Sequence, residues 1–132
     1  MNIFYICIGL LGILSLLLGV LVTIGRGKFN VLIGHSNDPE NTLHKFVRAH
    51  SNTAEYAPLL MVIIYLLSLY PVSNWVWWFI ILVTACRFLF VAGILIPKTM
   101  AKPNPMRFIG AVGTYIFGLG LCFALFQHAI KV

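Results

Sequence analysis

Four long apolar stretches organise the chain. They run over residues 3–24, 48–70, 75–96 and 105–127. Each is close to the roughly 20 residues that an α-helix needs to cross the hydrocarbon core of a bilayer. The pattern predicts an all-α protein, an integral membrane four-helix bundle, with a single domain over residues 1–132.

Composition supports a membrane protein and excludes an ordinary soluble domain. Of the residues, 61% are hydrophobic and 9% are charged, and the mean hydropathy is +0.98. A soluble core needs far less apolar surface. The net charge of +6 belongs mostly to the connections, where it favours contact with anionic membrane lipids. We therefore expect no nucleic-acid partner.

The basic residues are unevenly distributed among the connections. Arg26, Lys28 and Lys45 follow the first stretch and Lys98 and Lys102 follow the third, whereas the turn at 71–74 carries no charge. Basic connections usually face the cytoplasm. The asymmetry predicts that both basic connections are cytoplasmic and that both termini are on the non-cytoplasmic side.

Cysteine and histidine give no sign of a disulfide or a metal site. Cys7, Cys86 and Cys122 all lie within apolar stretches and form no C-x-x-C pair, so we interpret them as small packing residues. The four histidines include no pair at i, i+4, so no metal site is expected.

Small residues recur every four positions on two of the predicted helices. They are Ser15, Gly19 and Thr23 on the first, and Gly110, Thr114 and Gly118 on the last. This spacing is typical of close helix contacts in membranes.

A polar motif, "RAHSNTAEYAP", precedes the apolar run of the second stretch. That run, residues 56–70, would span only about 22 Å as a helix, too short for a ~30 Å core. The helix must therefore include the motif. At 100° per residue, Arg48, Asn52 and Glu55 fall within roughly a 60° arc, with Ser51 beside it. We expect this stripe to face inward and His50 to lie on the other side as an interfacial or packing residue.

Arg87 is a charge inside the third stretch and needs an internal partner. It lies about 14 Å from the end of its helix, and Glu55 lies about 10 Å inside the second. Glu55 is the one acidic residue within the four predicted spans, so we predict an Arg87–Glu55 ion pair. Such a pair either sets the register of the bundle or belongs to a functional site.

The segment "KPNPMRF" predicts how the last helix begins. Asn104 is suited to the N-cap and Pro105 to the first helical position, which places Arg107 third. A cation is unfavourable there, because the helix N-terminus is already partly positive, unless an anion binds.

Four arginines could share that anion. Arg26 lies at the same membrane face as Arg107, and with Arg48 and Arg87 they would line a cationic pocket open to the cytoplasm. The alternative is that Arg26 and Arg107 anchor at lipid headgroups.

These motifs together resemble the MAPEG family, the membrane-associated proteins of eicosanoid and glutathione metabolism, which include the microsomal glutathione transferases. The likeness rests on the helix 2 pattern R-x-H-x-N-x-x-E-x-x-P, on Arg87, on "PNPMR" and on Arg26. It implies a homotrimer that binds glutathione between neighbouring subunits. By position, the residues that hold glutathione would be Arg26, Arg48, Ser51, Asn52, Glu55 and Arg87, with Arg107 facing the thiol as the catalytic residue.

The resemblance implies a glutathione transferase that acts on lipophilic electrophiles, and it leaves open an accompanying peroxidase activity. The residue types suit the co-substrate glutathione, because guanidinium groups bind its two carboxylates and Glu55 can accept from its ammonium. A guanidinium beside a helix N-terminus also stabilises a thiolate, the reactive form of a thiol.

One departure from the family pattern keeps other functions open. Catalytic members generally carry a His or Tyr three residues after the helix 3 arginine and a Tyr seven residues after it, where this chain has Phe90 and Ile94. The chain could instead be a non-catalytic lipid-binding or scaffold relative. A small proton-coupled exporter, with Glu55 as its titrating group, is a further alternative.

Overall fold

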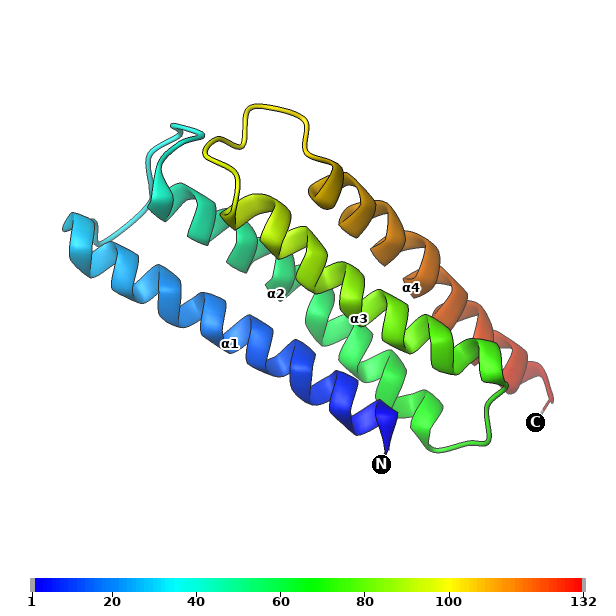
Figure 1. Ribbon diagram of the computed structural model, residues 1–132. Helices are drawn as coiled ribbons and strands as arrows, with labels where there is room; N and C mark the ends of the chain where they lie inside the picture. The colour runs from blue at the N-terminus through cyan, green and yellow to red at the C-terminus, as the bar shows by residue number, and fades with distance from the viewer. Residues whose placement is uncertain (1, 132) are drawn as a thin grey trace.

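The computed structural model describes residues 2–131 and contains four helices and, within that range, no strand. They are α1 (Ile3–Phe29), α2 (Thr42–Ser68), α3 (Asn74–Leu95) and α4 (Pro105–Lys131). Figure 1 shows the helices side by side, with both termini at one end and the α1–α2 and α3–α4 connections at the other. The predicted all-α four-helix bundle is confirmed.

Three helices extend further than their apolar stretches, and one of them, α4, continues past residue 127 to Lys131. α2 begins at Thr42 rather than at residue 48, because the Asn41 side chain accepts from the backbone N–H of His44 at 3.0 Å and caps the helix. α1 continues to Phe29 and ends at Asn30, which adopts the left-handed conformation (φ 53°). Hydropathy marks only the apolar part of a helix, so it misses turns that continue beyond it.

Three helices of the described chain are long and apolar enough to cross a membrane: α1, α3 and α4. α2 is as long as α1, at 27 residues, but its polar motif lowers its hydropathy. The protein is an integral membrane protein, and α2 is the least apolar of its four helices.

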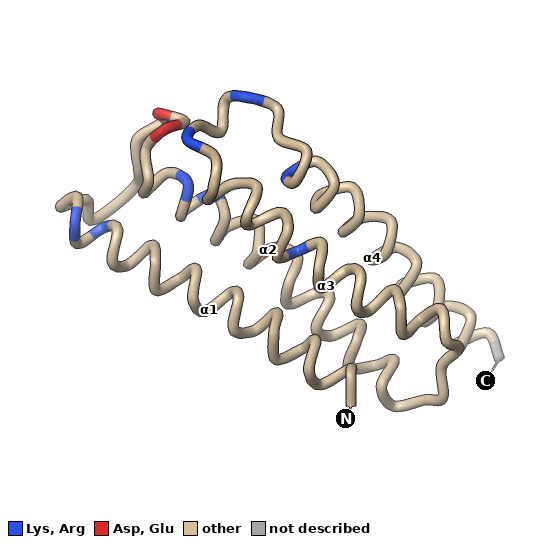
Figure 2. The backbone as a smooth tube through the Cα atoms, in the orientation of Figure 1, with Lys and Arg blue, Asp and Glu red and all other residues tan. Residues whose placement is uncertain are grey.

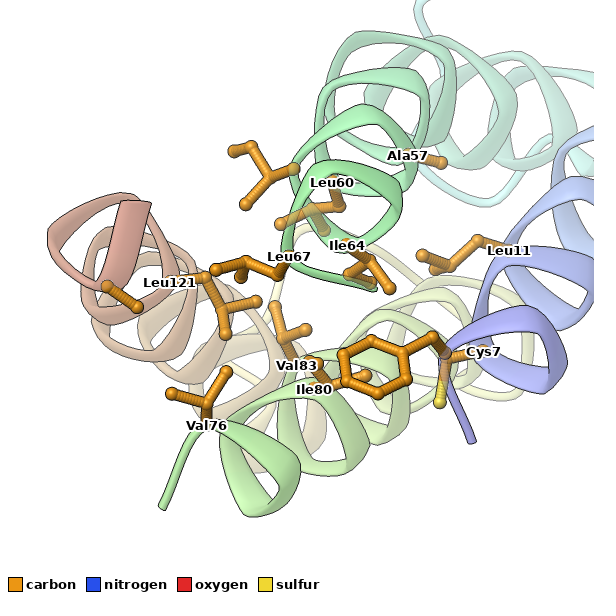
Figure 3. Close-up of a cluster of buried hydrophobic side chains, with 13 residues drawn as sticks. Cys7, Leu11, Ala57, Leu60, Ile64, Leu67, Val76, Ile80, Val83 and Leu121 are labelled. Atoms are coloured by element: carbon orange, nitrogen blue, oxygen red, sulfur yellow. The ribbon is translucent and has the colours of Figure 1, made fainter. Parts of the chain in front are cut away.

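A core of buried apolar side chains joins all four helices in the half of the bundle near the termini. Figure 3 shows α1, α2, α3 and α4 converging on this cluster. Its labelled members are Cys7, Leu11, Ala57, Leu60, Ile64, Leu67, Val76, Ile80, Val83 and Leu121. This core fixes the helices relative to one another and so positions the polar residues nearer the other end.

α3 and α4 pack backbone against backbone. A Cβ on Gly110 would lie 2.5 Å from the backbone nitrogen of Phe90, and one on Gly93 would lie 2.4 Å from that of Arg107. Only glycine allows this approach. Of the small-residue pattern on the last helix, Gly110 makes this close contact with α3, whereas a Cβ on Gly118 would lie 3.5 Å from the Leu60 side chain of α2. The contact of Gly93 with the Arg107 backbone sets the depth of Arg107 against α3.

Most of the basic residues gather at the end of the bundle that carries the two long connections. Figure 2 shows them there, and it also shows a basic position in the middle of α3. The sequence of that helix identifies it as Arg87. The two connections also touch, because the Met100 N–H donates to the Pro39 carbonyl at 3.0 Å. Both basic connections therefore lie at one end of the bundle.

Candidate functional site

Arg87 is the largest fully buried side chain of the described residues, with 1% of its surface exposed. Its guanidinium donates to the Asn52 side-chain oxygen at 2.8 Å and to the Thr53 hydroxyl at 3.4 Å. It also stacks over the rings of Tyr56 and Phe90, at 5.3 and 5.1 Å from the ring centres. Cation–π contacts of this kind stabilise a desolvated guanidinium. Arg87 thus joins α2 and α3 inside the subunit.

The predicted Arg87–Glu55 ion pair is wrong for this chain. Arg87 contacts Asn52 and Thr53, and Glu55 lies on the exposed side of α2. The reason is angular: two residues apart on a helix means about 200° of rotation, so Glu55 points away from the face that carries Thr53. Matching depths did not ensure matching directions.

The polar stripe on α2 faces outward, which corrects the expectation that it faces inward. Arg48, Ser51 and Glu55 are exposed, whereas Ala49 and Thr53 are fully buried on the opposite face. Asn52, at the edge of the stripe, is the member that reaches Arg87. The chain therefore presents an arginine, a hydroxyl and a carboxylate on the outer surface of a helix in a membrane protein.

Arg107 begins α4 in the predicted way. Asn104 is the N-cap, because its side-chain oxygen accepts from the backbone N–H of Arg107 at 3.2 Å. The Arg107 guanidinium donates to the carbonyls of Met100, at 3.0 Å, and Lys102, at 3.3 Å. The side chain is half-buried. It lines a groove whose walls are Phe90, Ala101, Pro103, Asn104, Phe108 and Ala111.

The contacts of Arg107 orient its charge without neutralising it. A guanidinium has five N–H groups, and the two carbonyls of the connection use two of them. Carbonyl oxygens are neutral, so the full positive charge remains at the groove, next to the partly positive N-terminus of α4. This arrangement can stabilise an anion there.

Arg26 and His50 line a second groove, between α1 and α2, together with Ser15, Gly19 and Thr23. Arg26 donates to the Leu32 carbonyl at 3.3 Å. The His50 ring packs against Gly19, with 3.4 Å between its Cε1 and the position of a Cβ there. The predicted packing role of His50 is confirmed, but its place beside Arg26 in this groove was missed. His50 is about 200° around the helix from Arg48, so the sequence already excluded it from the exposed stripe.

The expectation that four arginines line one pocket is wrong for a single subunit. Arg26 lies at the α1–α2 groove and Arg107 at the groove beside the α3–α4 connection. Arg87 is enclosed by α2 and α3, and Arg48 is exposed on α2. Each of these arginines lies on a different helix, and within the described residues α1, which carries Arg26, does not pack against α4, which carries Arg107.

Phe90 and Ile94 are core residues. They are 9% and 4% exposed and pack with Leu14, Leu18 and Ala49. Phe90 also contacts the Arg87 guanidinium through its ring. Polar side chains at these two positions would require partners, whereas this chain fills them with apolar packing.

Comparison with known proteins agrees with this architecture. The model of the MAPEG family matches residues 4–127, nearly the whole chain. No curated protein and no solved structure matches it. The chain belongs to the MAPEG family, the membrane-associated proteins of eicosanoid and glutathione metabolism.

Proposed function

We propose that this protein is a membrane-bound glutathione transferase in which Arg107 stabilises the glutathione thiolate. One observation carries the proposal: a half-buried guanidinium, held by two carbonyls at the N-terminus of α4, faces a groove with its charge unneutralised. A thiolate fits this position because it is the anionic and reactive form of a thiol. Membership of the MAPEG family supports glutathione as the thiol.

The proposed reaction is a substitution at carbon. The thiol proton leaves to solvent, the thiolate remains beside Arg107, and its sulfur attacks the electrophilic carbon of a lipophilic substrate. A carbon–sulfur bond forms as the bond to the leaving group breaks and the leaving group departs with its electron pair. Arg107 contributes by favouring the thiolate over the thiol at neutral pH.

The remaining candidate residues suit the charges of glutathione. Arg26, Arg48 and the polar side chains Ser51 and Asn52 offer donors to its two carboxylates, and Glu55 offers acceptors to its ammonium. Arg87 holds Asn52 by the 2.8 Å hydrogen bond. It would therefore act from inside the subunit, by orienting that amide.

The site is best explained by more than one copy of the chain, and we propose a homotrimer. Arg26 lies in the α1–α2 groove, whereas Arg48, Ser51 and Glu55 lie on the outward face of α2. His50, the α2 residue that lines that groove, is about 200° around the helix from Arg48, so the groove and the outward stripe face different directions in one chain. A neighbouring subunit could supply one of them, and it would also cover charges that are costly to leave facing lipid.

Conjugation kinetics test the proposal. The purified protein should conjugate glutathione to a chloronitrobenzene. At an assay pH below the thiol pKa of both variants, Arg107→Ala should lower kcat by about tenfold, the loss of thiolate that follows a one-unit rise in thiol pKa. Glutathione binding should largely persist, because the carboxylate contacts remain. Lys28→Ala, which removes an exposed cation at the same end of the bundle, is the control. Loss of activity in both variants would show a general charge effect and contradict the assignment.

A non-catalytic lipid-binding relative is the second candidate, and the burial of Phe90 and Ile94 favours it. Those positions lack the polar groups that the family resemblance associates with catalysis. This candidate predicts that wild type conjugates nothing at any glutathione concentration, yet binds a fatty-acid probe in a glutathione-independent manner.

A further inference from the structure

Lys45, in the first turns of α2, is buried. It is 9% exposed, and its ammonium donates to the Pro97 carbonyl at 2.6 Å. Pro97 follows the end of α3, where Leu95 is the last helical residue and Ile96 the cap. The sequence indicated Lys45 only as one of several cations in a connection. The structure places it inside, between α2 and the start of the α3–α4 connection.

A buried ammonium is unfavourable unless something compensates its charge. Among the described residues, Lys45 makes one side-chain hydrogen bond, to the Pro97 carbonyl. Pro97 directly follows the Ile96 cap, so this contact places the ammonium at the C-terminus of α3, where the last carbonyls of a helix carry partial negative charge. Lys45 therefore serves as a C-terminal cap for α3, supplied by α2.

From Pro97 a series of contacts leads to Arg107. The Met100 N–H donates to the Pro39 carbonyl at 3.0 Å, which fixes the middle of the α3–α4 connection to the α1–α2 connection. The carbonyl of the same residue, Met100, accepts from the Arg107 guanidinium at 3.0 Å. The connection is thus anchored at Pro97 and Met100, and the acceptors that orient Arg107 lie at and just after the second anchor.

We propose that Lys45 is a positioning residue for Arg107. Its ammonium fixes the start of the α3–α4 connection, and the connection in turn holds the guanidinium toward the groove. This inference rests on the proposed function, since it assigns Lys45 a role in stabilising the thiolate. Without the ammonium, the Pro97 carbonyl loses its partner, the connection moves more freely, and the guanidinium spends less time in the orientation that faces a thiolate.

The first test compares Lys45→Met, which keeps the apolar stem, with Lys45→Arg, which keeps the charge. In Lys45→Met the thiol pKa of bound glutathione should rise. At an assay pH below that pKa, kcat should fall by about threefold to tenfold, the change that half a unit to one unit of thiol pKa produces. Glutathione Kd should change less than twofold, because Lys45 contacts no part of the proposed binding surface. Lys45→Arg should recover most of the activity. Lys98→Met, at an exposed cation of the same connection, should behave like wild type.

The second test is independent of glutathione. Backbone hydrogen exchange over residues 97–104, measured in lipid nanodiscs, should be about tenfold faster in Lys45→Met than in wild type, since local opening governs exchange. Lys45→Gln, which keeps a neutral donor, should fall between the two and provides a second folded variant.

The two tests separate the failure of this inference from the failure of the proposed function. Unchanged exchange in both Lys45→Met and Lys45→Gln, or a faster exchange with an unchanged thiol pKa, would overturn the positioning role. A wild type that forms no thiolate would overturn the proposed function and with it the catalytic part of this inference. Faster exchange would then still support Lys45 as the anchor of the connection.

Discussion

Asn52→Ala should destabilise the subunit, whereas Glu55→Ala should not. The Asn52 oxygen accepts from the fully buried Arg87 guanidinium at 2.8 Å, and the Thr53 hydroxyl is a longer contact at 3.4 Å. A hydrogen bond to a charged group contributes about 1.5–3 kcal/mol, and its loss leaves a buried donor unpaired. Glu55 lies exposed on the opposite side of α2 from Thr53. Its removal should change the free energy of unfolding by less than about 0.5 kcal/mol.

A double-mutant cycle isolates the contact. Arg87→Leu removes the buried charge, and on that background Asn52→Ala should cost at least about 1 kcal/mol less than it does in wild type. The assay is denaturant unfolding of the purified protein in detergent without glutathione, followed by intrinsic fluorescence. The reasoning would be refuted if Glu55→Ala were as destabilising as Asn52→Ala, or if Glu55 rather than Asn52 coupled to Arg87.

Two further predictions concern packing and orientation. Gly110→Ala places a methyl group 2.5 Å from the Phe90 backbone nitrogen and should lower the free energy of unfolding by about 1–3 kcal/mol. The control Gly9→Ala, whose methyl group meets nothing within 4 Å, should not lower it. Equal thermal midpoints for the two variants would contradict the α3–α4 contact. We also propose that the basic end faces the cytoplasm. Single cysteines can be placed at Lys102 and at Ser73 in a background without native cysteines. Only the cysteine at Ser73 should then react with an impermeant reagent on intact cells. Labelling at Lys102 alone would reverse this orientation.

Local features of the fold could be predicted from the sequence, and features that depend on helix ends were partly missed. The apolar stretches gave all four helices, and Asn104 with Pro105 gave the start of α4, because capping depends on residues close in the chain. The early start of α2 was missed because residues 42–47 mix Leu43, Phe46 and Val47 with the polar Thr42, His44 and Lys45, so they do not extend the apolar run. An N-cap search before the apolar run would have found it.

Relations between helices were the harder part of the site. Depth along a helix follows from residue counting, so Arg87 and Glu55 were matched in depth but not in direction. The rotation of α2 about its own axis depends on packing over the whole bundle, and this rotation determines that the polar stripe faces outward. The burial of Lys45 was missed for a related reason. A lysine before an apolar run is usually exposed, and the burial of this one depends on Pro97 after the end of α3, which is 52 residues away in the chain but adjacent in space.

The central claim is that Arg107 stabilises a glutathione thiolate, and the direct measurement is a pH titration of the ultraviolet absorbance of the thiolate with glutathione bound to the purified protein. Wild type should show a thiol pKa well below that of free glutathione, and Arg107→Ala should raise it by about one unit, roughly 1.4 kcal/mol, while glutathione still binds. A wild-type protein that binds glutathione with the thiol pKa it has in solution, or an Arg107→Ala variant with an unchanged thiol pKa, would contradict the account.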